Sequence, residues 1–246
     1  MMLSKEEQLK IRQLCQESPQ AMQVCNIMNE QNQLQLSMVS HEIRNPVTLI
    51  NSFLQLLVST HPEIKSYNYW SEITENMHFL RALLENLSAY NNSQKLDREE
   101  VSVLSILKTV IASTAPSLSE KNISIHLKKE GAIPPFLIDR NRLQQVFLNL
   151  IRNSSEALCE SGGKITICLT ADVNEVTIQV QDNGPGIPDE YLETLFDFFV
   201  THKKNGTGLG LAISKNIIEA HGGTIEASVP EEGGSIFTIR LPITFQ

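Results

Sequence analysis

Glycine is distributed unevenly along this chain, and this distribution strongly restricts how its two parts can fold. The first 95 residues contain no glycine and only three prolines, whereas nine of the 12 glycines lie between Gly184 and Gly234. A long segment without helix breakers favours long helices. A segment dense in glycine permits tight turns and a close approach of the backbone to a ligand. The sequence therefore predicts a stiff helical first part and a second part with a backbone-lined binding site.

The glycine-free part has apolar residues at alternating steps of three and four, which is the spacing of a heptad seam. One run precedes Thr60-His61-Pro62 and a second run follows it. We expect two helices joined by a short turn as an antiparallel hairpin. A lone hairpin buries such a seam poorly, so we expect a homodimer whose two hairpins form a four-helix bundle. The runs comprise Leu36, Val39, Ile43, Pro46, Ile50, Phe53 and Leu57, then Trp70, Ile73, Met77, Leu80, Leu84 and Leu87.

The chain after residue 100 has the pattern of an α/β fold. Helical periodicity indicates helices over 103–115 and 209–220, and a third helix for which Asp139 is placed as the N-cap. The predicted fold class is a helical hairpin followed by an α/β sandwich, with helices on one face of a mixed sheet. Alternating apolar residues indicate strands near 123–127, 165–169, 176–180, 225–229 and 235–241. We expect a helical leader over 1–33, the hairpin over 34–93, a hinge over 94–100 and the α/β domain over 101–246.

The composition restricts the partners. A net charge of −8 argues against nucleic acid or an anionic membrane as the main partner, because both recruit basic surfaces. No apolar run approaches the ~20 residues that span a bilayer, and the first residues lack the apolar segment of a secretory signal. The four cysteines are scattered without metal-ligand spacing, which favours free thiols in a reducing compartment. We expect a cytoplasmic protein without a membrane span.

His41 is the first candidate for chemistry. With Ile43 counted as heptad position a, His41 falls at f, the position that points furthest from the bundle core. A neutral imidazole has a nucleophilic nitrogen at physiological pH. Glu42 beside it could accept the other ring proton. An exposed histidine is more often only a solvated surface residue, so the spacing alone leaves both interpretations open.

Asn149 and Asn153 form a second candidate site. They lie four residues apart in the helix that follows Asp139, so both amides project from one face of that helix. They are either two solvated asparagines or oxygen ligands for a hydrated Mg²⁺ that bridges nucleotide phosphates.

A third candidate site follows the strand near 176–180. Asp182 could accept a hydrogen bond from an exocyclic amine, while Gly184 and Gly186 let the backbone approach a flat base. The same pattern also fits a calcium loop or a plain turn.

The glycine-rich segment KKNGTGLGL, which starts at Lys203, is the fourth candidate site. Its glycines precede a predicted helix, where backbone N–H groups and the positive helix end attract phosphate. The segment follows no strand, which excludes a Rossmann-type dinucleotide site. The residues concerned are Gly206, Thr207, Gly208, Leu209 and Gly210.

These segments together resemble the sensor histidine kinase family. The string SHEIRNPVTLINSFLQLL around His41 resembles the H-box of the phosphoacceptor (HisKA) hairpin. The strings NLIRNSSEA, DNGPG and NGTGLGL resemble the N, G1 and G2 boxes of the GHKL ATP-binding fold, and Phe196–Phe199 resembles its F-box. Many family members have proline where Phe198 stands. In the order H, N, G1, F and G2, the boxes cover nearly everything from Leu34 to Pro242.

The resemblance assigns roles to the candidate residues. It implies that His41 is phosphorylated, that Glu42 is its acid/base partner, and that Asn45 orients water for dephosphorylation of the regulator. It also implies that Asn153 is the Mg²⁺ ligand and Asn149 a phosphate neighbour. Related ATPases carry glutamate at the position of Asn149, and asparagine cannot act as a base, which favours phosphoryl transfer over hydrolysis. The implied contacts to ATP are Asp182 with adenine N6 and Gly206–Gly210 with phosphates. Lys203 is placed either to reach the terminal phosphate or to remain a solvated charge of the lid.

The function implied is that of an ATP-dependent protein histidine kinase of a two-component system. It would pass the phosphoryl group to an aspartate of a response regulator, and its input would come through the leader or a separate sensory protein. The alternatives are a phosphotransfer or scaffold protein with a vestigial nucleotide-binding domain, and a hydrolytic ATPase of the GHKL superfamily.

Overall fold

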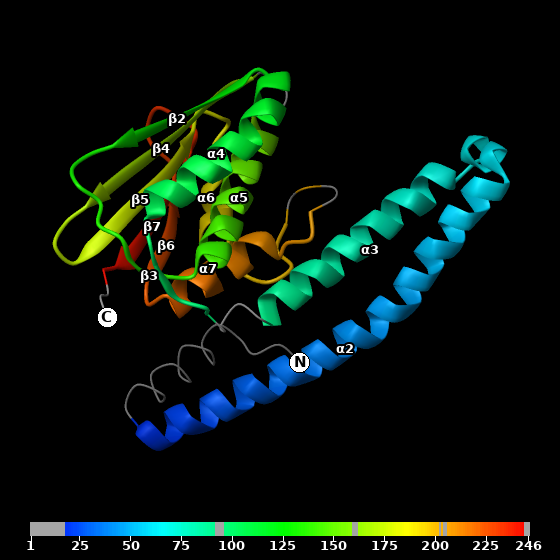
Figure 1. The fold of residues 1–246 in the computed structure, drawn as a ribbon, viewed down its shortest axis with the longest axis horizontal. Coiled ribbons are helices and arrows are strands. Elements are labelled where there is room, and N and C mark those ends of the chain that lie inside the picture. Colours follow the sequence, from blue (N-terminus) through cyan, green and yellow to red (C-terminus); the bar gives the residue numbers. More distant parts are fainter. Residues whose placement is uncertain (1–17, 92–95, 159–161, 202, 204–205, 244–246) are drawn as a thin grey trace. The chain divides into compact units, whose positions relative to one another are not determined.

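The computed structural model describes residues 18–91, 96–158, 162–201, 203 and 206–243. The chain divides into two compact units, Met1–Asn91 and Asn92–Gln246, which we describe separately (Figure 1). The first 17 residues of the predicted helical leader lie outside the described residues. Among the described helices, none is both long enough and apolar enough to cross a membrane.

The first unit is a helical hairpin. Helix α2 spans Pro19–Thr60 and runs through Pro46 without interruption. The short 3₁₀ helix η1 (Pro62–Ser66) follows, and α3 (Trp70–Asn91) returns along α2 (Figure 1). The predicted break at residues 60–62 is confirmed, because a proline at the first position of η1 cannot continue the i to i−4 hydrogen bonds of α2.

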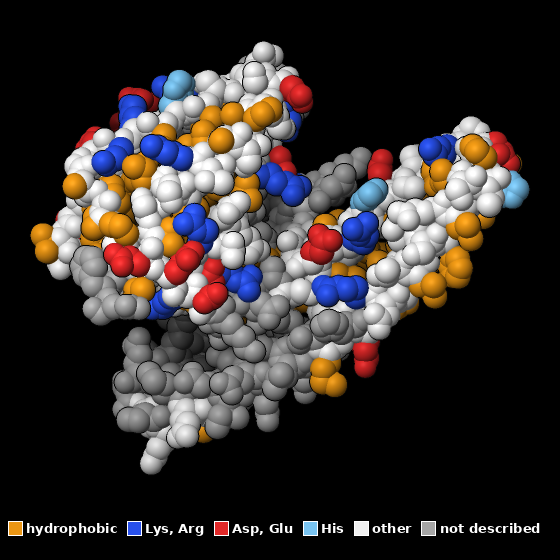
Figure 2. Space-filling model, in the orientation of Figure 1, with side chains coloured by type: hydrophobic (Ala, Val, Ile, Leu, Met, Phe, Trp, Pro, Cys, Tyr) orange, Lys and Arg blue, Asp and Glu red, His pale blue; other side chains and the backbone are white. Residues whose placement is uncertain are grey.

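The hairpin buries two residues of the predicted seam on α3, Met77 and Leu84, but on α2 it packs through apolar residues outside the predicted seam. Val47, Met77 and Leu84 are buried between α2 and α3, with Leu54 packed against them. Much of the predicted seam on α2 instead stays exposed within one chain, and Figure 2 shows apolar side chains along this helix. The exposed fractions are 44% for Ile43, 48% for Ile50, 56% for Phe53 and 40% for Leu57. The side chains of Leu36 and Val39 lie outside the described part of the chain.

The second unit is the α/β sandwich that the sequence predicted. Its five-stranded sheet has the order β2-β4-β5-β7-β6; β2 and β4 are parallel, and every other pair is antiparallel. Figure 1 shows that helices cover one face of this sheet. The strands are β2 (Ile123–Lys129), β4 (Gly163–Ala171), β5 (Glu175–Asp182), β6 (Thr224–Ser228) and β7 (Ser235–Pro242). The helices are α4 (Val103–Glu120), α5 (Arg140–Ala157) and α7 (Gly210–Ala220), with the short α6 at Asp189–Leu192.

The N-terminus of α5 is fixed by hydrogen bonds. The predicted cap is present, because Asp139 Oδ1 accepts a hydrogen bond of 3.0 Å from Arg142 N. The backbone N–H of Asp139 donates to His221 Nε2 at 3.0 Å, and His221 Nδ1 lies 2.7 Å from Ile217 O. His221 directly follows α7 and is 6% exposed. This buried histidine therefore joins the start of α5 to the end of α7.

Two features differ from the sequence prediction. A small antiparallel ribbon of β1 (Glu99–Val101) and β3 (Phe136–Ile138) includes two residues of the predicted hinge. Beside it, Asp97 N donates to Asp139 Oδ2 at 2.9 Å. The second unit therefore holds this end of the linker, which is the segment predicted as a hinge. Helix α4 extends past the predicted end at residue 115, because Pro116 sits inside the helix without ending it.

Candidate active site

Helices α5 and α7 meet where two of the predicted binding segments come together. Asn149 Nδ2 donates to Ser214 Oγ at 3.0 Å, across 65 residues of sequence. Ser214 Oγ in turn donates to Gly210 O at 3.0 Å. A Cβ atom on Gly210 would collide with Asn149 Oδ1, so a larger residue at this position would force the Asn149 side chain to shift. The amides of the first turn of α7 have no partner within the helix and can face an anion.

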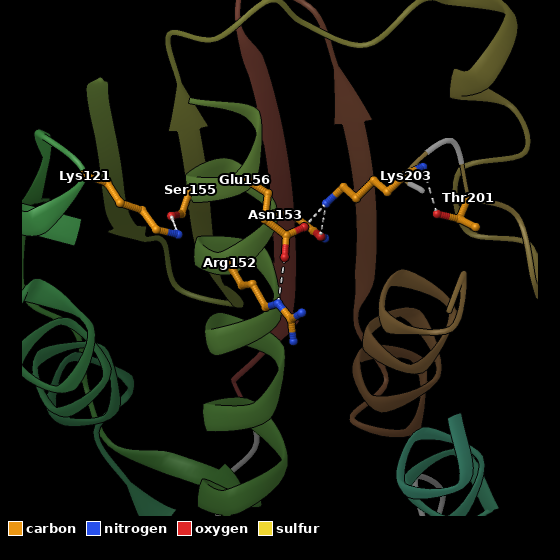
Figure 3. Close-up of polar contacts among 7 residues, drawn as sticks. All are labelled: Lys121, Arg152, Asn153, Ser155, Glu156, Thr201 and Lys203. Atoms are coloured by element: carbon orange, nitrogen blue, oxygen red, sulfur yellow. Dashed lines mark hydrogen bonds and ion pairs between the residues drawn. The ribbon is translucent and has the colours of Figure 1, made fainter. Parts of the chain in front are cut away.

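Asn153 lies one turn further along α5 and faces a cation. Its Oδ1 accepts a hydrogen bond of 2.9 Å from Lys203 Nζ, as Figure 3 shows. The same ammonium also pairs with Glu156 Oε2. Arg152 Nε donates to the other oxygen of this carboxylate, Oε1, at 2.8 Å. Asn153 and Glu156 therefore direct two oxygens from one face of α5 at a single positive charge.

The charges around Glu156 keep its carboxylate ionised. Burial by itself would raise the pKa of Glu156, but the hydrogen bonds from Lys203 and Arg152 and the attraction of both positive charges outweigh it. The pKa of Glu156 therefore lies below its ordinary value. One carboxylate between two cationic side chains leaves this part of the site with an excess of positive charge.

Asp182, at the end of β5, is a buried acceptor with 3% exposure. Its Oδ1 accepts from two backbone N–H groups, Gly184 N at 3.0 Å and Ser235 N at 3.3 Å. Its Oδ2 accepts from two hydroxyls, Ser154 Oγ at 3.1 Å and Ser235 Oγ at 2.6 Å. Ser154 belongs to α5, so Asp182 links the sheet to the helix that carries the two asparagines.

The glycine-rich segment before α7 is folded against the F-box segment. Gly208 has a φ of +66°, and a side chain there would collide with the backbone of Phe199. Phe199 N donates to Gly208 O at 3.0 Å. Leu209 is buried, and its N–H donates to Thr207 Oγ1 at 3.5 Å. Gly206 N donates to Lys203 O at 3.1 Å, which ties the start of the segment to the lysine.

The predicted phosphoacceptor residues lie in the hairpin unit. Glu42 and Asn45 are exposed on α2. His41 lies in the same helix, and its side chain is outside the described part of the chain. Arg44 Nη2 donates to Leu84 O at 3.4 Å and thereby links this part of α2 to α3.

Several residues of the site were not predicted from the sequence. They are Ser154 and Ser235 beside Asp182, Ser214 beside Asn149, Glu156 beside Lys203, and Arg152 beside Glu156. Glu156 had a sequence signal, because its spacing of three from Asn153 places both on one side of a helix. The two serines of Asp182 are 81 residues apart, and no local pattern relates them.

Comparison with known proteins gives matches to both units. The family model described as the His Kinase A (phospho-acceptor) domain matches residues 31–95. The model of the histidine kinase-, DNA gyrase B-, and HSP90-like ATPase matches residues 138–244. The sensory histidine kinase/phosphatase NtrB of Azospirillum brasilense is 34% identical over 222 residues, which are 84% of this chain and 54% of that protein. The chain thus spans about half the length of this relative.

Two solved structures are also similar. The catalytic domain of the histidine kinase ThkA matches with 33% identity and a TM-score of 0.57, over 61% of this chain and 97% of that domain. ThkA in complex with the response regulator protein TrrA matches with 28% identity and a TM-score of 0.63, over 97% of this chain and 66% of that one.

Proposed function

The chain belongs to the histidine kinase family, and from this premise we propose that it is an ATP-dependent protein histidine kinase of a two-component system. The observation that carries the proposal is the contact between the two asparagines of α5 and the glycine-rich segment around α7. Asn149 touches Gly210, and Asn153 faces Lys203. This contact brings the predicted N and G2 boxes together on one side of the second unit.

The described residues fit an adenine nucleotide. Asp182 is a buried carboxylate beside glycines, and two of its present donors are hydroxyls that can rotate towards another partner. We propose that Asp182 accepts from the exocyclic amine of adenine, with Gly184 and Gly186 beside the base. The phosphates would lie against Gly206, Thr207, Gly208, Leu209 and Gly210 at the start of α7.

Asn153 also fits a divalent cation. Its Oδ1 already accepts from an ammonium group, so it is directed at positive charge, and oxygen is the ligand that Mg²⁺ prefers. We propose Asn153 as the Mg²⁺ ligand and Asn149 as a neighbour of the phosphates. Asn149 carries a neutral amide that donates to Ser214, and an amide cannot activate water as a base. This supports phosphoryl transfer over hydrolysis.

In the proposed reaction, bound Mg-ATP supplies the phosphoryl group. A ring nitrogen of His41 forms the bond to phosphorus as the bond to ADP breaks, and Glu42 takes the proton of the other ring nitrogen. Positioning and electrostatics account for most of the catalysis in such a transfer. His41 would then give the phosphoryl group to an aspartate of a response regulator. Asn45 would orient water when the protein acts as a phosphatase.

A homodimer is part of this proposal. The hairpin leaves large side chains of α2 and α3 exposed within one chain, and a second copy would cover them in a four-helix bundle. A cytoplasmic location and input through a separate sensory protein complete the proposal.

The test is labelling of the purified protein with [γ-³²P]ATP. We expect acid-labile, alkali-stable label on the wild type and none on His41→Gln. Asn153→Ala should reduce labelling at least roughly a hundredfold, because a group that acts on transition-state charge contributes a few kcal/mol. Label that persists in His41→Gln would overturn the assignment of the phosphoacceptor. Release of free phosphate without labelled protein would favour the hydrolytic ATPase.

A further inference from the structure

Lys203 occupies the position that the proposed function assigns to a metal ion. Its Nζ lies 2.9 Å from Asn153 Oδ1 and also pairs with Glu156 Oε2, and Figure 3 shows both side chains converging on it. An ammonium group and a divalent cation both require oxygen acceptors. They cannot share the same two oxygens, because like charges within a few ångström of each other repel strongly.

Glu156 supplies the negative charge that Asn153 lacks as a metal ligand. An amide oxygen carries no net charge, whereas Mg²⁺ at nucleotide sites is usually bound by one or two carboxylates together with the phosphates. Glu156 is the carboxylate three residues further along α5, on the side that faces Asn153. Arg152 holds Oε1 at 2.8 Å, which leaves Oε2 directed at the shared point.

We propose that Asn153 Oδ1 and Glu156 Oε2 form one cation-binding site. This site holds the Lys203 ammonium in the nucleotide-free chain and the divalent ion when Mg-nucleotide is bound. The inference rests on the proposed function, because it assumes that nucleotide binds beside α5. Glu156 is then a metal ligand, and Lys203 competes with the metal ion for the same two oxygens and leaves them when the metal binds.

Partial exposure makes such an exchange feasible. The side chain of Lys203 is 46% exposed and that of Glu156 is 33% exposed. An ion pair in contact with water contributes little net stability, so its replacement by another cation costs little. Once displaced, the ammonium of Lys203 is available to the phosphates, which is the role expected of this lysine.

The experiment measures binding of ADP to the whole chain by isothermal titration calorimetry, with Mg²⁺ and with EDTA. ADP is chosen because it lacks the terminal phosphate that Lys203 is expected to contact. The readout is the Mg²⁺ enhancement, defined as the Kd in EDTA divided by the Kd in Mg²⁺. A change that affects only phosphate binding alters both Kd values and largely cancels in this ratio.

Two comparisons separate the roles of the residues. Lys203→Met removes the competitor and should raise the Mg²⁺ enhancement at least threefold over the wild type. Adding Glu156→Gln to Lys203→Met removes the proposed ligand, with no competitor present, and should lower the enhancement at least tenfold. The matched controls, Lys108→Met and Glu219→Gln, change the same charges on exposed parts of α4 and α7 and should leave the enhancement as in the wild type.

The outcomes distinguish the inference from the function on which it rests. If the wild type binds ADP but Glu156→Gln leaves the Mg²⁺ enhancement unchanged in the Lys203→Met background, Glu156 is not a metal ligand. The proposed cation-binding site is then refuted. If Lys203→Met leaves the enhancement unchanged, the competition is overturned. If the wild type does not bind ADP at all, the proposed function itself fails. Thermal melts followed by circular dichroism establish that each variant is folded.

Discussion

The two oxygens of Asp182 face different kinds of hydrogen-bond donor. We therefore expect the fold to tolerate Asp182→Asn but not Asp182→Ala. Oδ1 faces the fixed backbone N–H groups of Gly184 and Ser235, whereas Oδ2 faces the rotatable hydroxyls of Ser154 and Ser235. In Asp182→Asn, the amide oxygen keeps both backbone bonds and the amide nitrogen donates to a rotated hydroxyl. The loss is then the difference between charge-assisted and neutral hydrogen bonds, about 1–2 kcal/mol of unfolding free energy.

Asp182→Ala removes every acceptor from the same buried position. Two backbone N–H groups and two serine hydroxyls lose their partner, and each unsatisfied buried group costs about 1–3 kcal/mol. Some of these groups will find water, so we expect a total loss of about 3–5 kcal/mol, which few single substitutions reach. Asp172→Asn is the matched control, because its exposed carboxylate accepts from the hairpin amides of Asn174 and Glu175 at the surface. This control should change stability little.

The assay combines urea unfolding, followed by circular dichroism, with titration of ADP. Asp182→Asn should remain folded, with a modest decrease in the urea midpoint. It should bind ADP at least roughly tenfold more weakly, because an amide nitrogen that donates to a serine cannot also accept a hydrogen bond from the adenine amine. Asp182→Ala should unfold at much lower urea. An equal loss of stability in both variants would refute the different roles of the two oxygens, and so would an Asp182→Asn protein that binds ADP as tightly as the wild type.

The remaining predictions concern acid stability, packing and assembly. Burial lowers the pKa of His221 from its ordinary 6.5, and the positive charge of Arg98 lowers it further. As the pH decreases, His221 is therefore protonated in the unfolded chain at a higher pH than in the folded chain. The free energy of unfolding should consequently fall as the pH decreases below about 6.5. Arg98→Ala should make the urea midpoint less sensitive to acid, and an unchanged pH profile would contradict this assignment. Gly210→Ala should cost about 1–3 kcal/mol and weaken ADP binding, because its methyl group collides with Asn149; native-like affinity would contradict the close approach. Phe53→Glu should raise the dimer Kd at least roughly tenfold in sedimentation, unlike Gln55→Glu, and an unaffected dimer would place Phe53 outside the interface.

Local signals in the sequence were sufficient for most of the second unit. The cap at Asp139 and the alternating strands were predicted correctly, because each depends on neighbours within a few residues. The ribbon of β1 and β3 was missed, since three-residue strands carry too few positions to show a period. The contact of Lys203 with Asn153 joins residues 50 apart, and only the folded chain brings them together.

The hairpin shows a different limit of sequence reasoning. A helix in a four-helix bundle has two contact surfaces, one for its own hairpin partner and one for the second copy. The heptad period identifies apolar positions but does not say which surface each position serves. Val47 and Leu54 turned out to face α3, while Ile50 and Phe53 of the predicted seam stay exposed within one chain. The heptad pattern alone therefore could not tell which apolar positions of α2 face α3.

The antiparallel pair of α5 and α7 connects the candidate site to the linker. At one end Asn149 touches Gly210, and at the other end Asp139 and His221 share a hydrogen bond beside the ribbon of β1 and β3. Two packed helices respond to a ligand as stiff bodies, so ordering at one end restricts opening at the other. Saturating Mg-ADP should therefore slow amide exchange in the residues of β1, measured by hydrogen-exchange mass spectrometry, while the last turn of α4 serves as the unaffected reference. Equal exchange in β1 with and without nucleotide would show that the linker end moves independently of the site.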